Sequence, residues 1–158
     1  MQKFILLDID GVMVPASGWK PVAIHADGFY QFSQIAQRSL EWLLGETNST
    51  IILTTTHRTR YSSIEWKELL SRRFQAVNEV LTLDDSCNQP IPLRFSRLDD
   101  VVKWVHIHGN ASYVILDDDS SLHALPDNIK THWVKTFPNI GLNTEAAEKA
   151  LEILHAAV

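Results

Sequence analysis

Three groups of acidic and hydroxyl side chains come directly after short apolar runs of the sequence. They are Asp8-Ile9-Asp10-Gly11, Thr54-Thr55 and Asp117-Asp118-Asp119. Carboxylates that end buried segments lose their hydration at a large free-energy cost, so several that converge require a cation. Because the ligand atoms are oxygens, this cation is expected to be hard, and carboxylates combined with water and a phosphate suit Mg²⁺. The residue types and their positions therefore predict a magnesium site.

The segments that carry these groups have the pattern of β-strands buried on both faces. Apolar runs predict strands over residues 3–7, 50–53, 80–83 and 112–116, with a weaker fifth strand over 132–136. Residues 15–29 are expected to form an irregular loop. Helical spacing predicts the connecting helices, which cover residues 32–43 with Gly45 at the end, 63–74, 98–105 with Gly109 at the end, and a last helix capped by Asn143 or Thr144.

Strands that alternate with helices predict an α/β fold, namely a three-layer α/β/α Rossmann-like domain with a mainly parallel five-stranded sheet. In such a sheet the carboxyl ends of the strands lie at one edge, where reactive groups gather. The three groups are therefore expected to meet at this edge. The length of 158 residues predicts a single domain over 1–158 with little chain left for accessory structure.

The composition excludes several classes of protein. A net charge of −5 argues against a broadly basic surface that binds nucleic acid without specificity. No apolar run reaches the roughly 20 residues that span a bilayer, and residues 4–7 are too short for the core of a signal peptide. The single cysteine, Cys87, excludes a disulfide framework. We therefore expect a cytoplasmic domain with no membrane contact, and the composition leaves its oligomeric state open.

The order and spacing of the three groups resemble the signatures of the haloacid dehalogenase (HAD) superfamily. Asp8-Ile9-Asp10-Gly11 resembles the first signature, Ile51-Ile52-Leu53-Thr54 the second, and Asp117-Asp118 the fourth. The chain most resembles the small capless HAD domains of RNA-repair proteins. These domains pair a hydroxyl-rich strand end with an arginine, here residues 54–58, and carry a Gly-Leu pair before the last helix, here residues 141–142. The resemblance implies a Mg²⁺-dependent phosphatase that hydrolyses phosphomonoesters through an aspartyl-phosphate.

The resemblance also implies a role for each residue of the first signature. Asp8 would be the nucleophile and a metal ligand. Asp10 would protonate the leaving oxygen and then deprotonate water, and it would bind the metal through its backbone carbonyl alone. Gly11 would let the chain turn sharply beside the substrate, where a side chain would obstruct it.

In the second and fourth signatures, the resemblance implies contacts with phosphate and metal. Thr54 would donate a hydrogen bond to a phosphoryl oxygen, with Thr55 as a second donor. Asp118 would be the direct metal ligand of its pair, and Asp117 would act behind it or through a water molecule. Such groups act by positioning the substrate and stabilising its charge.

The third signature should be a lysine that neutralises the phosphate and the nucleophile, but the expected place holds Arg97. Arginine supplies the same charge with a different hydrogen-bond geometry. Lys103, further along the same predicted helix, is the second candidate, and Arg94 is the third. If none of them reached the site, the chain would be a catalytically degenerate HAD scaffold that binds phosphate ligands. Arg58 is expected either to contact substrate or to form a salt bridge with the acids.

The site is expected to be open, because the segment between Val14 and Gln31 is long enough for a flap but too short for a folded cap. Trp19, Lys20, His25 and Tyr30 would lie near its rim. An open site admits phosphate on a nucleotide, a nucleic-acid end or a phosphoprotein, and the RNA-repair resemblance favours the first two. A receiver-type signalling module is a further alternative, although receivers lack the D-x-D-G strand ending.

Overall fold

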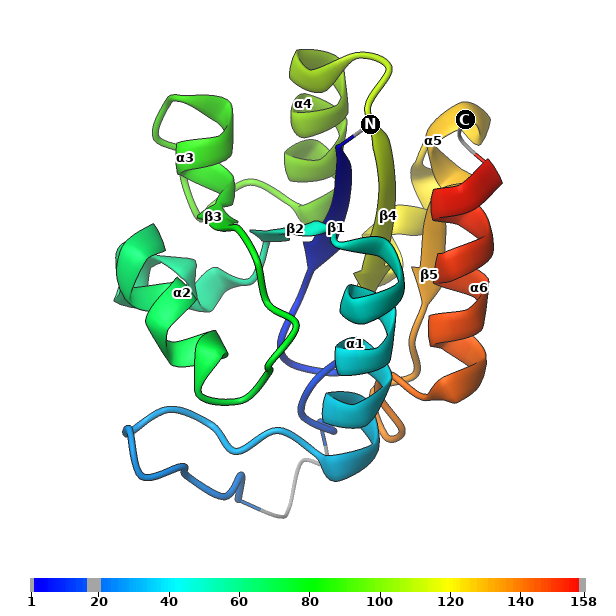
Figure 1. The fold of residues 1–158 in the computed structure, drawn as a ribbon. Helices are drawn as coiled ribbons and strands as arrows, with labels where there is room; N and C mark the ends of the chain where they lie inside the picture. Colours follow the sequence, from blue (N-terminus) through cyan, green and yellow to red (C-terminus); the bar gives the residue numbers. More distant parts are fainter. Residues whose placement is uncertain (1, 17–20, 157–158) are drawn as a thin grey trace.

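The computed structural model describes residues 2–16 and 21–156. At its centre lies a parallel sheet of five strands in the order β3-β2-β1-β4-β5 (Figure 1). The strands are β1 (Lys3–Leu7), β2 (Thr50–Leu53), β3 (Val80–Thr82), β4 (Ser112–Asp117) and β5 (Trp133–Lys135). Every pairing between neighbours is parallel. The predicted α/β sheet is therefore confirmed.

Helices cover both faces of this sheet (Figure 1). The longer helices are α1 (Gln34–Thr47), α2 (Ser63–Ser71), α4 (Arg97–His108) and α6 (Thr144–Ala156). Successive side chains of a strand point to opposite faces, so Ile5 and Leu7 of β1 pack in one core cluster with α1, α2 and α6. Leu6 packs in a second cluster with α4. Two cores on either side of one sheet confirm the three-layer architecture.

Several element boundaries differ from the sequence prediction. Gly45 lies inside α1, which continues to Thr47 and ends where Asn48 takes a left-handed conformation (φ 52°) and donates to the carbonyl of Leu44 at 2.8 Å. Asparagine tolerates this conformation, so it ends the helix in place of glycine. Helix α2 ends at Ser71, earlier than predicted.

Four short helical elements have no counterpart in the sequence prediction. They are η1 (Thr56–Arg60), α3 (Leu83–Cys87), η2 (Ser120–Ala124) and α5 (Asp127–Lys130). Each is too short to show a helical repeat of apolar residues. No helix among the described residues has the length and apolar character needed to cross a membrane.

The part of the flap that the structure describes, residues 21–31, contains one isolated bridge and no helix. It runs past α2 (Figure 1), where Asp27 forms an ion pair with Arg73, just after the end of that helix. The carboxylate of Asp27 accepts hydrogen bonds from both terminal nitrogens of the buried Arg73, at 2.6 and 2.9 Å. Arg73 also donates to the carbonyl of Tyr30 at 2.9 Å. The described residues thus form a flap that is tied down, with no folded cap.

Candidate active site

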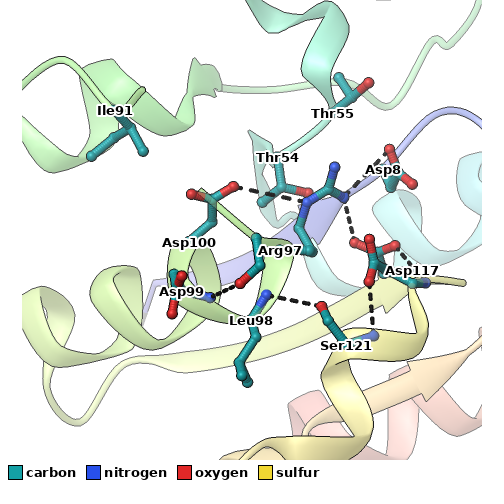
Figure 2. Close-up of polar contacts among 12 residues, drawn as sticks. Asp8, Thr54, Thr55, Ile91, Arg97, Leu98, Asp99, Asp100, Asp117 and Ser121 are labelled. Carbon is teal, nitrogen blue, oxygen red and sulfur yellow. Dashed lines mark hydrogen bonds and ion pairs between the residues drawn. The ribbon is translucent and has the colours of Figure 1, made fainter. Parts of the chain in front are cut away.

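The strand ends bring the acidic and hydroxyl groups together at the carboxyl edge of the sheet. In the parallel register, Leu7 lies beside both Leu53 and Leu116, so Asp8, Thr54 and Asp117 follow at the same level. Backbone hydrogen bonds from Asp8 N to Leu116 O (3.2 Å) and from Thr54 N to Leu7 O (3.1 Å) hold this level. Figure 2 shows the three side chains around one point.

Three carboxylates form a compact cluster at this edge. One oxygen each from Asp8, Asp117 and Asp118 lies within 4.8 Å of the others. Burial and the negative charge of Asp117 raise the pKa of Asp8 from 3.8 to about 8. Burial and Asp117 also raise the pKa of Asp118. The raised pKa values show that these acids lack sufficient positive charge, and oxygen donors at this spacing fit a hard divalent cation.

Arg97 partly compensates the buried acids. Its Nη1 lies 2.5 Å from Asp117 Oδ2 and 3.5 Å from Asp8 Oδ1, and its side chain is 8% exposed (Figure 2). Burial alone would lower the pKa of the guanidinium, but Asp117 and Asp8 raise it above its ordinary value. Arg97 is the first residue of α4, whose N-terminus Ser96 caps by accepting a hydrogen bond from Asp99 N.

Of the three cations predicted for the third signature, the structure brings only Arg97 to the acids. Lys103 lies further along α4, where its charge acts on the thiol of Cys87, and no ion pair among the described residues includes it. The guanidinium of Arg94 lies over the ring of Phe95, with 5.3 Å between Arg94 Cζ and the ring centroid. Among the described residues, Lys103 thus has no ion pair with the clustered acids, whereas Arg97 has two.

The two threonines after β2 differ in their contacts. The Thr54 hydroxyl is buried and has no hydrogen-bond partner among the described residues. A buried hydroxyl without a partner costs about 1–3 kcal/mol, so its oxygen is available to a ligand. The Thr55 hydroxyl instead caps η1 and accepts a hydrogen bond from His57 N at 3.2 Å. The predicted substrate contact fits Thr54, whereas Thr55 has a structural contact.

The structure corrects the expectation that Arg58 contacts substrate. Its residue is 2% exposed, and Nε donates to Asp84 Oδ1 at 2.8 Å. Nη2 donates to the carbonyl of Ile91 at 3.0 Å, and Nη1 to the carbonyls of Thr54 and Thr55 at 3.4 Å each. The alternative, a salt bridge to the clustered acids, is also wrong, because the partner of Arg58 is Asp84 of α3. Arg58 braces the end of β2 from inside.

Asp10 and Gly11 lie at the mouth of the site. The side chain of Asp10 is 53% exposed and stands outside the carboxylate cluster, as a backbone-only metal contact requires. Its Oδ2 lies 2.9 Å from His57 Nε2. Gly11 has φ +80°, and a Cβ there would overlap the carboxylate of Asp118. Glycine is therefore needed both for the turn and for the close approach of Asp118.

Sequence reasoning missed Asp100, and it missed the contact that His57 makes with Asp10. Asp100 lies on α4 behind Arg97, with 4.0 Å between Asp100 Oδ2 and Arg97 Nε (Figure 2), and burial raises its pKa to about 6. The i,i+3 spacing on one helix was the signal for this pair. His57 contacts Asp10 across a long stretch of sequence, so only its position after the second strand end marked it.

The predicted rim is described in part. Trp19 and Lys20 lie outside the described residues. His25 and Tyr30 both belong to the flap, where His25 accepts a hydrogen bond from Asp27 N at 3.1 Å. The ring centroid of Tyr30 lies 5.2 Å from that of His57. Tyr30 thus lies near Asp10, as the expected rim requires.

Comparison with known proteins identifies the family. Residues 4–147 match the family model described as the HAD domain in Swiss Army Knife RNA repair proteins. A comparison with curated proteins found no match. The match runs from β1 into α6 and includes all three strand ends. The chain therefore belongs to this HAD family and has the phosphohydrolase-type scaffold of its superfamily.

Proposed function

We propose that the protein is a Mg²⁺-dependent phosphomonoesterase that works through an aspartyl-phosphate on Asp8. The observation that carries this proposal is the cluster of Asp8, Asp117 and Asp118, with oxygens within 4.8 Å, next to the unpartnered hydroxyl of Thr54. The cluster suits a divalent cation, and the hydroxyl suits an oxygen-rich ligand. A bound phosphate ester and its metal would satisfy both.

The acids differ in how freely they could bind the metal. Asp117 already accepts hydrogen bonds at both oxygens, from Arg97 at 2.5 Å and from Asp119 N at 3.0 Å. Asp8 and Asp118, with the backbone carbonyl of Asp10, are therefore the proposed ligands of Mg²⁺. The bound ion would keep Asp8 ionised at neutral pH and neutralise phosphate charge. Asp117 would hold Arg97 in place behind them.

In the proposed reaction, an oxygen of Asp8 attacks phosphorus in line with the leaving oxygen. As the Asp8–phosphorus bond forms, the bond to the leaving oxygen breaks and Asp10 gives that oxygen a proton. Asp10 then takes a proton from water as its oxygen bonds to phosphorus, and the Asp8–phosphorus bond breaks to release inorganic phosphate. Arg97 and Thr54 contact the phosphoryl oxygens during both steps and stabilise their charge.

A nucleotide or a nucleic-acid end is the favoured substrate, because the matched family is named for RNA repair proteins. The absence of a cap among the described residues and the exposure of Asp10 are compatible with a substrate much larger than the site. A phosphoprotein is the alternative substrate, since it too is much larger than the site. The absence of the expected lysine favours a degenerate scaffold, but Arg97, with Nη1 3.5 Å from Asp8 Oδ1, supplies a positive charge beside the nucleophile and argues against this alternative.

The test is the turnover of p-nitrophenyl phosphate by wild type and by Asp8→Asn, each with Mg²⁺ and with EDTA. We expect turnover by wild type with Mg²⁺ only. Activity that persists in Asp8→Asn would refute the covalent mechanism, and a folded wild type without any turnover would favour the scaffold. Oligonucleotides with terminal phosphates, nucleoside monophosphates and a phosphoserine peptide would then be compared by kcat/KM.

A further inference from the structure

We infer that His57 is a positioning residue that fixes the carboxyl group of Asp10 for proton transfer. The inference rests on the proposed function, because it concerns the same site and the same reaction. It assigns a task to a histidine that the phosphatase mechanism above does not use.

The contact is direct and lies at the mouth of the site. His57 Nε2 is 2.9 Å from Asp10 Oδ2, which is a hydrogen-bond distance, and in the tautomer assigned here Nε2–H donates to this oxygen. Among the described residues, no other side chain bonds to this carboxylate. The Asp10 side chain is 53% exposed, so without His57 it would rotate freely between its rotamers. Proton transfer requires one of them.

The imidazole is held by two parts of the chain. The backbone N–H of His57 donates to the hydroxyl of the cap residue Thr55 at 3.2 Å, which fixes the backbone that carries the ring. Its ring meets the rings of Phe29 and Tyr30 from the flap nearly at right angles, with centroid distances of 5.7 and 5.2 Å. Edge-to-face contacts of this kind favour one ring orientation. With the side chain 17% exposed, His57 is a rigid support for a more exposed group.

The geometry leaves the two oxygens of Asp10 with different tasks. Because Oδ2 is bonded to His57, Oδ1 is the oxygen left to give its proton to the leaving oxygen and later to take one from water. His57 neither gains nor loses a proton during these two reaction steps. Misplacement of a reacting group by about 1 Å can cost about 10²-fold in rate, so loss of the support should slow the acid-dependent step.

The choice of leaving group separates this task from a structural one. An alkyl phosphate such as β-glycerophosphate needs protonation of its leaving oxygen, whereas p-nitrophenolate leaves without it. The value of kcat/KM reports the steps up to release of the leaving group. His57→Phe keeps the aromatic packing and removes the donor, whereas His57→Gln keeps an N–H donor near the position of Nε2. His106→Ala, at an exposed position of α4, is the control for loss of a histidine.

We expect His57→Phe to lower kcat/KM for β-glycerophosphate by about 10–10²-fold and for p-nitrophenyl phosphate by less than about threefold. His57→Gln should recover most of the loss, and His106→Ala should match wild type. Equal losses on both substrates, or a folded His57→Gln as impaired as His57→Phe, would overturn the role of His57 alone. A wild type inactive on both substrates would refute the phosphatase and this inference together.

Discussion

Arg97→Met removes the cation that contacts both Asp8 and Asp117, and we expect it to destabilise the protein. The Asp117 residue is fully buried, so its carboxylate would lose its partner at 2.5 Å without gaining water. Removal of one partner of a buried ion pair costs about 3–5 kcal/mol. Asp117 Oδ1 still accepts from Asp119 N, and the carboxyl group can take up a proton. The expected loss at neutral pH is therefore about 3 kcal/mol.

Urea unfolding followed by circular dichroism in EDTA measures this loss. Because a domain of this size has a free energy of unfolding of about 5–15 kcal/mol, the variant should still fold. Added Mg²⁺ should recover part of the loss by supplying charge to the same acids. Lys103→Met is the control on the same helix, with an expected change within about 0.5 kcal/mol. A loss below about 1 kcal/mol for Arg97→Met would refute the view that Arg97 compensates the buried acids.

Three further variants test other parts of the site. Thr54→Val removes the unpartnered hydroxyl, so urea unfolding should show equal or higher stability, while kcat/KM for p-nitrophenyl phosphate falls about 10²-fold; unchanged turnover would contradict a phosphate contact. Asp8 keeps a proton up to about pH 8 when folded but releases it near its ordinary pKa of 3.8 when unfolded, so the metal-free protein should lose stability as the pH rises between these values. Asp100, with a pKa of about 6, adds to the lower part of this range, and the raised pKa of Asp118 adds to the same dependence, so Asp8→Asn should have a smaller slope above pH 6 than wild type, and an unaltered slope would count against the raised pKa of Asp8. Arg58→Met should lose about 3 kcal/mol of stability and retain the KM of wild type at low temperature, whereas a raised KM would restore Arg58 as a substrate ligand.

The framework of the site was predictable because it depends on strand ends. Apolar runs buried on both faces mark β1, β2 and β4, and parallel pairing places the residues after them side by side. Asp8, Thr54 and Asp117 therefore follow from sequence pattern alone. Arg97 depended also on the HAD resemblance, which implies a cation at this distance before Asp118.

The remaining contacts depend on side-chain directions, which sequence spacing does not determine. From its position after β2, the side chain of Arg58 could point either toward the substrate or into the protein. It points into the protein because it donates hydrogen bonds to Asp84 and to the carbonyl of Ile91. The Thr55 hydroxyl bonds locally to η1, a helix too short to predict. The contact of His57 with Asp10 joins residues far apart in the sequence, and the flap rings that pack on the imidazole are also distant from it along the chain.

The ion pair of Asp27 with Arg73 has a consequence for how substrate enters. The buried guanidinium of Arg73 binds the flap at Asp27 and at the carbonyl of Tyr30. Residues 21–31 are therefore expected to stay in place when substrate binds, and not to act as a lid that must close. We therefore expect association without a slow gating step, and selectivity that arises from the fixed shape of the entrance. The same flap residues, Phe29 and Tyr30, pack against His57. A change in the packing of the flap should therefore also change the orientation of the proton donor Asp10.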